Sequence, residues 1–555
     1  MNLGIDFGST YTTISTYNDA QKQLKDICLH EGSPYIPSVV AAKGDEYYFG
    51  SSAKIQTGKK NISTFKAFKM MLPEFREENL AARGYSRVNT PQSIAERFLS
   101  YCMREALKRT GEEKIEHLIV GVPEVWNEQM NTMDGRNILK KICAKQDFVE
   151  QVQIVSEPAA ASAFFAHNYQ TNTGKNFVGN ILLIDYGGGT LDITLTNVQT
   201  QDSGAMEIKV EERTGAGENE QGEIGKAGVI FMESVMQKAI QESDLFPNGA
   251  ARDAKFFKAV DDLEAMLKTS EQIIADEFDS YDLDNIEELD EVEFTTIEYR
   301  GEDISVSYGL MVRVYNQVIA PVLDEQLNQM IQYMEKHRID YQDEDQDGFK
   351  IALVGGFGNF YLVNAQVQSK FRFSSTDKRK TDIICDASDR EKAVAMGAAL
   401  LASGVVSIRN TAPYSIGIST SSGNFDYAIR YKQDIEFDHP YFARGRMDGK
   451  PRVFLIGAPP ESFVINRGED DKTALEVSIK AEFIERMKEL IRFADSQHMT
   501  AIIGFSLDSS GILSVHARPY DPYSRQIGEE DHYIVLDSFN NIFGMAEARP
   551  AGRNG

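Results

Sequence analysis

Cysteine is scarce in this chain of 555 residues, which contains only Cys28, Cys102, Cys143 and Cys385. These four lie far apart, and none belongs to a CxxC pair or a Cys/His cluster. A disulfide framework or a zinc module needs such groups at defined spacing, so neither is expected. We expect reduced thiols in a core, which is the usual state of cysteine in a cytoplasmic protein.

A long apolar run and an excess of basic residues are also missing. The longest apolar stretch, residues 393–406, contains two glycines and a serine and is too short to span a bilayer. Asp6 interrupts the N-terminal apolar run and no basic segment precedes it, so no signal peptide is expected. The 58 basic and 84 acidic residues give a formal charge of −26. This charge argues against a general nucleic-acid binder and against docking to anionic membranes. We therefore expect a cytoplasmic protein.

What is present is a distinctive stretch near the middle of the chain, from Ile181 to Ile193. An apolar run ends in Asp185, and three glycines, Thr190 and a second alternating run follow. This pattern predicts a strand, a tight turn and a returning strand. Glycine lets backbone N–H groups surround an anion, and a hard cation such as Mg²⁺ would reconcile the carboxylate with a phosphate. An ordinary hairpin with a glycine-rich turn is the alternative.

The same pattern occurs at the N-terminus, in residues 3–14. Aligning Asp6 with Asp185 also aligns Ile14 with Ile193. A strand, acid, glycine and hydroxyl pattern used twice indicates two duplicated lobes that face one ligand. Two such loops closing on a polyphosphate would bring both carboxylates near one metal ion.

Two further segments carry candidate groups. Residues 62–72 have an amphipathic spacing that predicts a helix ending before Pro73. On this helix Lys69 is either a solvated charge or a group that reaches a phosphate. Residues 154–161 predict a strand followed by a helix, which leaves Glu157 at the strand end. This carboxylate either faces a ligand or caps the helix.

Strand and helix patterns alternate up to about residue 405, which indicates an α/β sheet architecture. Within this part, a buried strand at 350–354 runs into Gly355 and Gly356, where the backbone can approach a flat ligand closely. Beyond residue 412, short alternating strands and glycine or proline turns dominate, and residues 502–517 form a hairpin pattern. The sequence therefore predicts a separate β-rich module at the C-terminal end.

These motifs resemble those of a known superfamily. Three segments are similar to the two phosphate motifs and the adenosine motif of the actin-like ATPases: residues 6–11, 185–192 and 354–358. Three others look like the seventy-kilodalton heat-shock chaperones of the DnaK type: residues 120–123, 154–161 and 393–399. The hairpin at 507–517 resembles the end of that family's β-sandwich peptide-binding domain.

The resemblance implies an α/β fold of two duplicated lobes followed by an all-β, sandwich-like domain. The domains implied are an actin-like nucleotide-binding domain at 1–405, a linker at 406–412, a peptide-binding domain at 413–540 and a flexible tail at 541–555. The helical lid of the family has too few residues here, so we expect a divergent, lidless member.

The resemblance also implies a role for each matching residue. Asp6 and Asp185 would hold Mg²⁺ through its waters. The residues implied in catalysis are Lys69, Glu157, Asp185 and Asp192. The residues implied in binding ATP or ADP are Gly8, Ser9, Thr10, Tyr11, Gly187, Gly188, Gly189, Thr190, Gly225, Glu264, Lys268, Gly355, Gly356 and Phe357.

Two departures from the family pattern bear on function. Phe357 and Asn359 stand where the family has serine and arginine, so adenine stacking is expected to differ. Residues 403–410 replace the leucine-rich acidic linker of the family, which bears on how two domains would be coupled.

Three functions follow, in order of preference. The first is a chaperone that hydrolyses ATP slowly to control its hold on unfolded or extended polypeptide, with a J-domain co-chaperone and a nucleotide exchange factor as further partners. The second is an ATP-binding regulatory or interaction protein with little hydrolysis. The third is a small-molecule kinase on the same fold, which would leave the β-rich module without a role.

Overall fold

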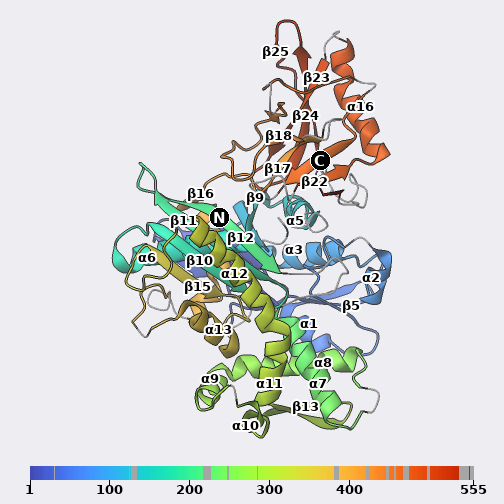
Figure 1. The fold of residues 1–555 in the computed structure, drawn as a ribbon. Coiled ribbons are helices and arrows are strands. Elements are labelled where there is room, and N and C mark those ends of the chain that lie inside the picture. Colours follow the sequence, from blue (N-terminus) through green and yellow to red (C-terminus); the bar gives the residue numbers. More distant parts are fainter. Residues whose placement is uncertain are drawn as a thin grey trace. The chain divides into compact units, whose positions relative to one another are not determined.

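A computed structural model describes the chain except at residues 30–31, 75, 124–125, 127–133, 217–226, 247–248, 284, 375, 381–386, 420–424, 446–448, 456–457, 467–473, 497–499, 537–548 and 551–555. The fold is mixed α/β (Figure 1). It divides into two compact units. Unit 1 contains residues 1–125, 146–151 and 155–407, and unit 2 contains residues 126–145, 152–154 and 408–555.

The first sheet of unit 1 is built around its N-terminal strand. The strands lie in the order β3 (Gln23–Asp26), β2 (Tyr11–Asn18), β1 (Asn2–Phe7), β8 (Ile115–Val122) and β9 (Val149–Ser156), and β4 (Ile36–Pro37) pairs with β2. Strand β1 is antiparallel to β2 and parallel to β8. Leu3, Ile5 and Phe7 alternate along β1 and are fully buried, which fixes the register of the strand.

The second sheet repeats this arrangement. Its order is β15 (Phe349–Val354), β10 (Gly179–Tyr186), β11 (Leu191–Thr200), β12 (Met206–Ala216) and β16 (Val406–Ile408). Strand β10 is antiparallel to β11 and parallel to β15. Ile184 pairs with Ile193 as Ile5 pairs with Ile14, so the two hairpins share one register. The duplication predicted from the aligned motifs is therefore present in the backbone pairing.

Helices cover these sheets. Thr90 caps α3 (Pro91–Thr110) by accepting a hydrogen bond from the Ser93 backbone N–H. Pro158 lies in the first turn of α6 (Glu157–Thr173), as predicted. The remaining helices of unit 1 are α1 (Gly50–Gln56), α2 (Glu77–Ala82), α7 (Gly228–Glu242), α8 (Ala254–Thr269), α9 (Glu271–Asp279), α10 (Ile286–Asp290), α11 (Tyr308–Val314), η1 (Tyr315–Ile319), α12 (Ala320–Lys336), α13 (Tyr361–Phe371), α14 (Ala387–Arg390) and α15 (Ala393–Ala402). Within the described residues, no helix combines enough length with enough apolar character to cross a bilayer.

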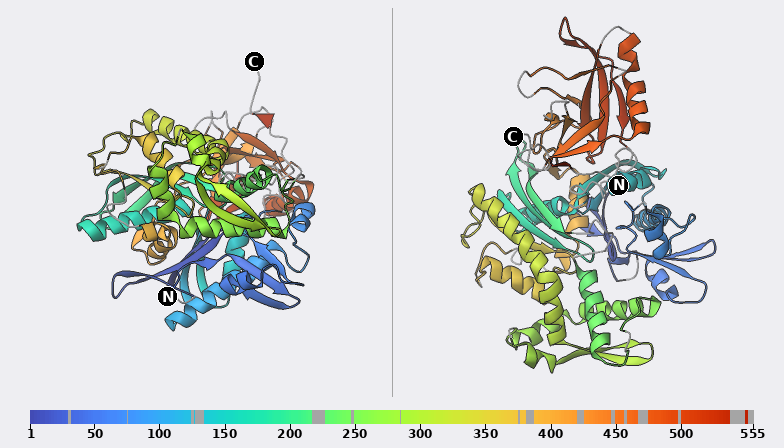
Figure 2. Two further views of the ribbon diagram at one scale, coloured as in Figure 1. Left: turned by 90° about the horizontal axis from the view of Figure 1, so that it is seen from below. Right: turned by 45° about the vertical axis from the view of Figure 1, so that its right-hand side comes forward.

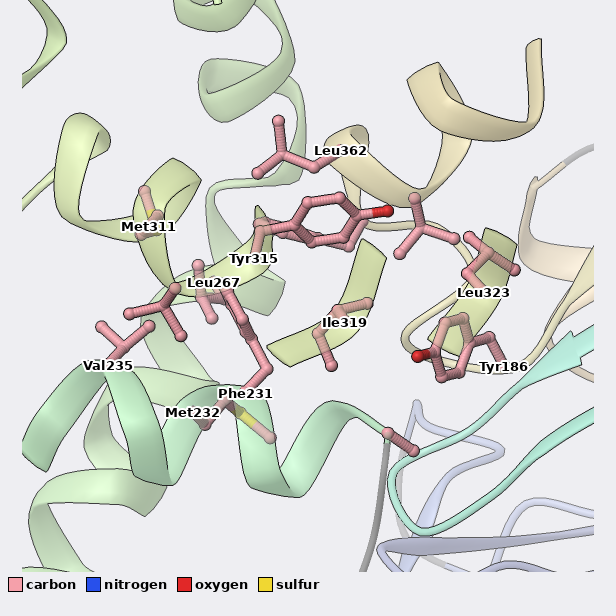
Figure 3. Packing of buried hydrophobic residues seen from close by; sticks show 14 of the residues in the cluster. Tyr186, Phe231, Met232, Val235, Leu267, Met311, Tyr315, Ile319, Leu323 and Leu362 are labelled. Atoms are coloured by element: carbon pink, nitrogen blue, oxygen red, sulfur yellow. The ribbon is translucent and has the colours of Figure 1, made fainter. Parts of the chain in front are cut away.

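The core around the second sheet joins its strands to several helices, among them α7, α11, η1 and α12. Helix α12 packs against β11 and β12 (Figure 1). Figure 3 shows Phe231 of α7 close to Tyr315 and Ile319 of η1, and all three side chains are buried. Met311 of α11 belongs to the same cluster. These hydrophobic contacts include side chains of β10 and β11 and therefore stabilise the hairpin that the two strands form.

The prediction of a helix at residues 62–72 is wrong. Residues 63–66 form strand β7 (Ser63–Lys66), which pairs with β5 (Val39–Lys43) beside β6 (Glu46–Phe49). Consecutive turns follow, in which the Met70, Met71 and Leu72 amides bond to carbonyls three residues back. These turns reproduce a helical spacing of buried residues without forming a helix.

The described residues of unit 2 form two sheets. One has the order β18 (Phe425–Ile429), β17 (Ser415–Ser419), β21 (Ser462–Asn466), β22 (Leu475–Ser478) and β27 (Arg549–Pro550). The other has the order β19 (Tyr441–Phe442), β23 (Thr500–Leu507), β24 (Leu513–Asp521) and β25 (Gln526–Ile527), with β20 (Val453–Phe454) on β23 and β26 (His532–Val535) on β24. Both sheets contribute to one core, for example through Phe463 and Phe505, whose rings lie 5.0 Å apart.

Unit 2 also contains helices. Helix α16 (Ala481–Ser496) runs along β24 (Figure 2) and adds Met487 and Ile491 to the core, so this part is not composed of strands alone. Helix α5 (Asp134–Ala144) also groups with unit 2. There the Lys140 ammonium lies 2.6 Å from Asp508 Oδ2.

The cysteines agree with the thiol state expected from their spacing. Cys28, Cys102 and Cys143 are free, and Cys385 lies outside the described residues. Burial raises the pKa of the Cys102 and Cys143 thiols, which keeps them protonated. These two thiols act as small core residues.

Candidate active site

The turns of the two matching hairpins lie against each other. A Cβ atom added at Gly188 would lie 2.8 Å from Thr10 Oγ1, and one at Gly189 would lie 3.2 Å from Ser9 Oγ. The loops can approach this closely because these residues have no side chain. The structure therefore brings together the hydroxyl loop of the first hairpin and the glycine loop of the second, which are far apart in sequence.

Asp6 and Asp185 occupy equivalent ends of β1 and β10, behind these loops. Burial is the main cause that raises the pKa of Asp6 to about 7, and the Glu157 carboxylate adds to it. Burial also raises the pKa of Asp185 well above its usual range, and repulsion from Glu157 and Asp6 adds to this rise. In both cases the Lys69 ammonium acts in the opposite direction. The four groups therefore share one electrostatic environment in which negative charge is in excess.

Lys69 and Glu157 form an ion pair inside this site. Their side chains are 3% and 9% exposed. Glu157 is the first residue of α6 and follows directly on β9, so the strand-to-helix switch predicted from the sequence sets its position. Lys69 reaches it from the turns after β7. A buried charge pair of this kind costs desolvation energy, which is characteristic of functional sites as well as of structural ones.

Asp192 and Thr190 lie beside Asp185. Asp192 is directly opposite Asp185 in the antiparallel pair of β10 and β11, so both side chains project from the same face of the sheet. Asp192 is fully buried and Thr190 is 7% exposed. The Gly187 amide donates to the Thr190 carbonyl at 3.0 Å and closes the turn.

The glycines after β15 also reach this region. Gly355 has a φ of +82°, and a Cβ atom there would lie 2.5 Å from Asp185 Oδ1. Gly356 is exposed and has open space beside it. The Phe357 ring packs among aromatic side chains, with its centroid 5.2 Å from Tyr186 and 5.4 Å from Phe360. The structure thus holds Phe357 against the aromatic core of the second lobe.

Tyr11, Glu264 and Lys268, which the resemblance implies in nucleotide binding, also lie close together. The Lys268 ammonium lies 3.7 Å from the centroid of the Tyr11 ring. The same ammonium lies 3.5 Å from Glu264 Oε1. Gly8 precedes the first turn, and a Cβ atom there would lie 2.1 Å from the Tyr11 carbonyl oxygen. Gly225 lies outside the described residues.

Sequence reasoning missed several groups around this site. Lys54 donates to the Tyr11 hydroxyl at 3.1 Å. Glu391 accepts hydrogen bonds from the Asn359 side chain at 2.9 Å and from the Tyr35 hydroxyl. These contacts join segments distant in sequence, and no local motif marks them.

The donor set fits a magnesium ion bound together with a phosphate. Among the described residues, no group of three or more His, Cys, Asp or Glu side chains could hold a metal ion by itself. Mg²⁺ is usually bound by one or two carboxylates together with waters and phosphate oxygens. Burial and mutual repulsion raise the pKa values of Asp6 and Asp185, and a nearby cation would favour the charged form of both acids.

Comparisons with known proteins agree with this arrangement. The sequence profile described as Hsp70 protein matches residues 2–223, which include both hairpins, Lys69 and Glu157. In these residues, the chain is similar to the Hsp70 family. The Hsp70 match does not extend over the second half of unit 1 or over the part of unit 2 after residue 407.

Three individual relatives illustrate the similarity. The chaperone protein DnaK of Mycoplasmoides gallisepticum is 30% identical over 196 residues, 35% of this chain and 30% of the relative. The chaperone protein DnaK of Metamycoplasma hominis is 28% identical over 207 residues, 37% of this chain and 31% of the relative. A chaperone protein HscA homolog of Rickettsia conorii is 23% identical over 93% of this chain and 74% of its own length. The alignments with the two DnaK proteins span only about a third of their length.

Proposed function

We propose that this chain is an ATP-dependent molecular chaperone of the DnaK type, which binds and hydrolyses ATP to control its hold on unfolded or extended polypeptide. The observation that carries the proposal is the close approach of Gly188 and Gly189 to Thr10 and Ser9, with Asp6 and Asp185 behind them. Such paired loops suit a polyphosphate, because their amides and hydroxyls can surround it from two sides.

Each residue of the site has a role in this proposal. Ser9, Thr10 and the loop from Gly187 to Thr190 would bind phosphate oxygens, and Asp6 and Asp185 would hold Mg²⁺. Bound there, Mg²⁺ would neutralise charge on the phosphates. Lys69, Glu157 and Asp192 orient the attacking water and stabilise charge. Catalysis by positioning and electrostatics is the usual demand of phosphoryl transfer.

The binding of the rest of the nucleotide is also proposed. Gly8 and Gly225 border the phosphates, Tyr11, Glu264 and Lys268 bind the adenosine from one side, and Gly355, Gly356 and Phe357 back it from the other. The Tyr11 and Lys268 contact supports this grouping, because it brings both residues to one place.

The second part of the proposal concerns the C-terminal part of the chain. Its two sheets with a shared core support a sandwich-like peptide-binding domain at 413–540, connected to the nucleotide-binding domain at 1–405 by a linker at 406–412. The proposed clients are unfolded or extended polypeptides, with a J-domain co-chaperone and a nucleotide exchange factor as partners. A cytoplasmic location completes the proposal and rests on the scarce, widely spaced cysteines.

The deciding experiment is single-turnover hydrolysis of ATP by the full chain, with Mg²⁺ and with or without an extended apolar peptide. We expect slow, Mg²⁺-dependent hydrolysis whose rate changes when peptide is present. Tight ATP binding with negligible hydrolysis, indifferent to peptide, would overturn the chaperone proposal and support an ATP-binding regulatory protein instead.

A further inference from the structure

Unit 2 contains a cavity of about 480 Å³ that is separate from the candidate active site. Its walls come from β18, residues 439–444, β24 and residues 527–529. Pockets for small organic ligands are typically about 300–1,000 Å³ and combine apolar walls with a few polar groups. By size this cavity can hold such a ligand or the end of a peptide.

One wall of the cavity is aromatic. Tyr427, His439, Tyr441 and Phe442 all line it. The Phe442 ring lies over the backbone of β23, because a Cβ atom at Gly504 would be only 2.7 Å from Phe442 Cδ1. Aromatic faces of this kind bind flat apolar groups by stacking and burial.

The cavity is lined by more basic than acidic side chains, the opposite of the whole chain. The whole sequence has more acidic than basic residues, but the cavity is lined by two guanidinium groups, Arg444 and Arg518, and one carboxylate, Glu529. Arg444 and Glu529 are exposed, whereas Arg518 is only 27% exposed. A guanidinium group offers paired donors whose geometry matches a carboxylate.

Arg518 is held in place by an aromatic ring and by one long hydrogen bond. Its guanidinium carbon lies 5.5 Å from the centroid of the Phe442 ring. Among the described residues, its Nη2 reaches Asp531 Oδ2 at 3.5 Å, the limit of a hydrogen bond, and its Nε has no hydrogen-bond partner. Asp531 Oδ2 is also 3.0 Å from His516 Nδ1, and Ser506 Oγ is 2.8 Å from His516 Nε2. This chain of contacts positions Asp531, and through it Arg518.

We propose that this cavity binds a carboxylate attached to an aromatic or similarly flat apolar group. The carboxylate pairs with Arg518 and Arg444, and the apolar group packs against Phe442 and Tyr427. A free aromatic acid and the C-terminal aromatic residue of a peptide offer the same chemistry. The inference does not depend on the proposed ATPase, because all of its residues lie in unit 2.

The test is isothermal titration of the full chain with N-acetyl-L-phenylalanine and with its C-terminal amide. We expect the acid to bind at least ten times more tightly than the amide, because only the acid supplies a charge for the two arginines. Equal binding of the acid and the amide, or no binding of the acid, would overturn the proposal.

Matched variants locate the site. Arg518→Met should weaken binding of the acid at least tenfold, whereas Arg492→Met should leave it unchanged, because Arg492 pairs with Glu489 on an exposed face of α16. If Arg518→Met does not fold, Arg444→Met is the variant to measure, because the Arg444 side chain is exposed. Its loss should weaken binding of the acid at least threefold. Unaltered binding in Arg444→Met and Arg518→Met would refute the assignment.

A peptide pair separates the two sources of the ligand. The probes are a short peptide that ends in phenylalanine with a free carboxylate and the same peptide with an amidated C-terminus. Binding of the free-acid peptide as tight as that of N-acetyl-L-phenylalanine supports a peptide ligand. Binding of the small acid alone supports a free aromatic acid.

Discussion

Lys69 and Glu157, 88 residues apart in sequence, form an ion pair with both side chains buried. Removing one partner of a buried pair leaves an uncompensated charge, which costs roughly 3–5 kcal/mol. Lys69→Met should therefore lower the free energy of unfolding by about that amount, measured by urea denaturation. The double variant Lys69→Met/Glu157→Gln should recover most of the loss.

An exposed pair is the control for this prediction. Lys114 and Glu150 are 63% and 51% exposed and lie 3.2 Å apart. Lys114→Met should cost no more than about 1 kcal/mol, because solvent screens such pairs. Equal losses in Lys69→Met and Lys114→Met would show that burial does not set the strength of the first pair.

Asp185→Asn should separate folding from Mg²⁺-dependent chemistry. The substitution removes one of several buried carboxylates that repel each other, so the nucleotide-free protein should melt no lower than the wild type. The rise in melting temperature that Mg²⁺ and ATP produce by binding to the folded state should be lost, together with hydrolysis. Asp45→Asn, in an exposed turn, is the matched control. Unchanged hydrolysis in Asp185→Asn would remove the assignment of this site.

Gly356→Ala tests the nucleotide position without disturbing the protein. A Cβ atom at Gly356 meets nothing within 4 Å, and the residue does not have a positive φ, so the melting temperature should not change. The methyl group would enter the space proposed for the nucleotide, and ATP should bind about tenfold more weakly, a loss of about 1.4 kcal/mol. Gly348→Ala makes only ordinary contacts and should alter neither quantity. Wild-type affinity in Gly356→Ala would contradict the proposed adenosine position.

The stability of unit 2 should depend on pH through the buried side chain of His516. Burial lowers its pKa below the ordinary value of 6.5; Arg518 acts in the same direction, and Asp531 and Asp438 oppose it. The unfolded chain therefore takes up a proton at a higher pH than the folded chain does. The stability contributed by neutral His516 is present above pH 6.5 and is lost as the pH falls through the lower pKa of the folded state.

The measurement compares His516→Asn with the wild type. Asparagine keeps a donor for Asp531 but does not titrate near neutral pH. The melting temperature of the wild type, relative to that of the variant, should fall as the pH is lowered below 6.5, the ordinary pKa of histidine. Parallel curves for the two proteins would rule out His516 as the titrating group.

The parts of the fold that could be predicted from sequence are those with local signals. An aspartate, glycines and a hydroxyl between two alternating runs define each hairpin, and the equal spacing around Asp6 and Asp185 also predicts the shared register. The strand-to-helix switch at Glu157 was predictable for the same reason, because Pro158 favours a first helical turn.

The parts that sequence missed depend on contacts between distant segments. Residues 62–72 imitate a helix because turns bonded three residues apart bury the same positions, and only the pairing of β7 with β5 reveals the difference. The hydrogen bond from Lys54 to the Tyr11 hydroxyl joins a helix and a hairpin that carry no common motif. The grouping of α5 with the C-terminal part likewise has no signature in its own sequence.

The parallel pairings of β1 with β8 and of β10 with β15 have a consequence for how this chain is made. Strand β1 pairs Asn2 with His117, and β10 pairs Asn180 with Phe349. Such long-range pairings form slowly, because closing a large loop costs entropy before any stabilising contact can form. During synthesis the apolar strands β1 and β10 emerge well before β8 and β15 exist to cover them. The nascent chain therefore exposes the kind of unpaired apolar segment that promotes aggregation, and it should itself need assistance while it is being made.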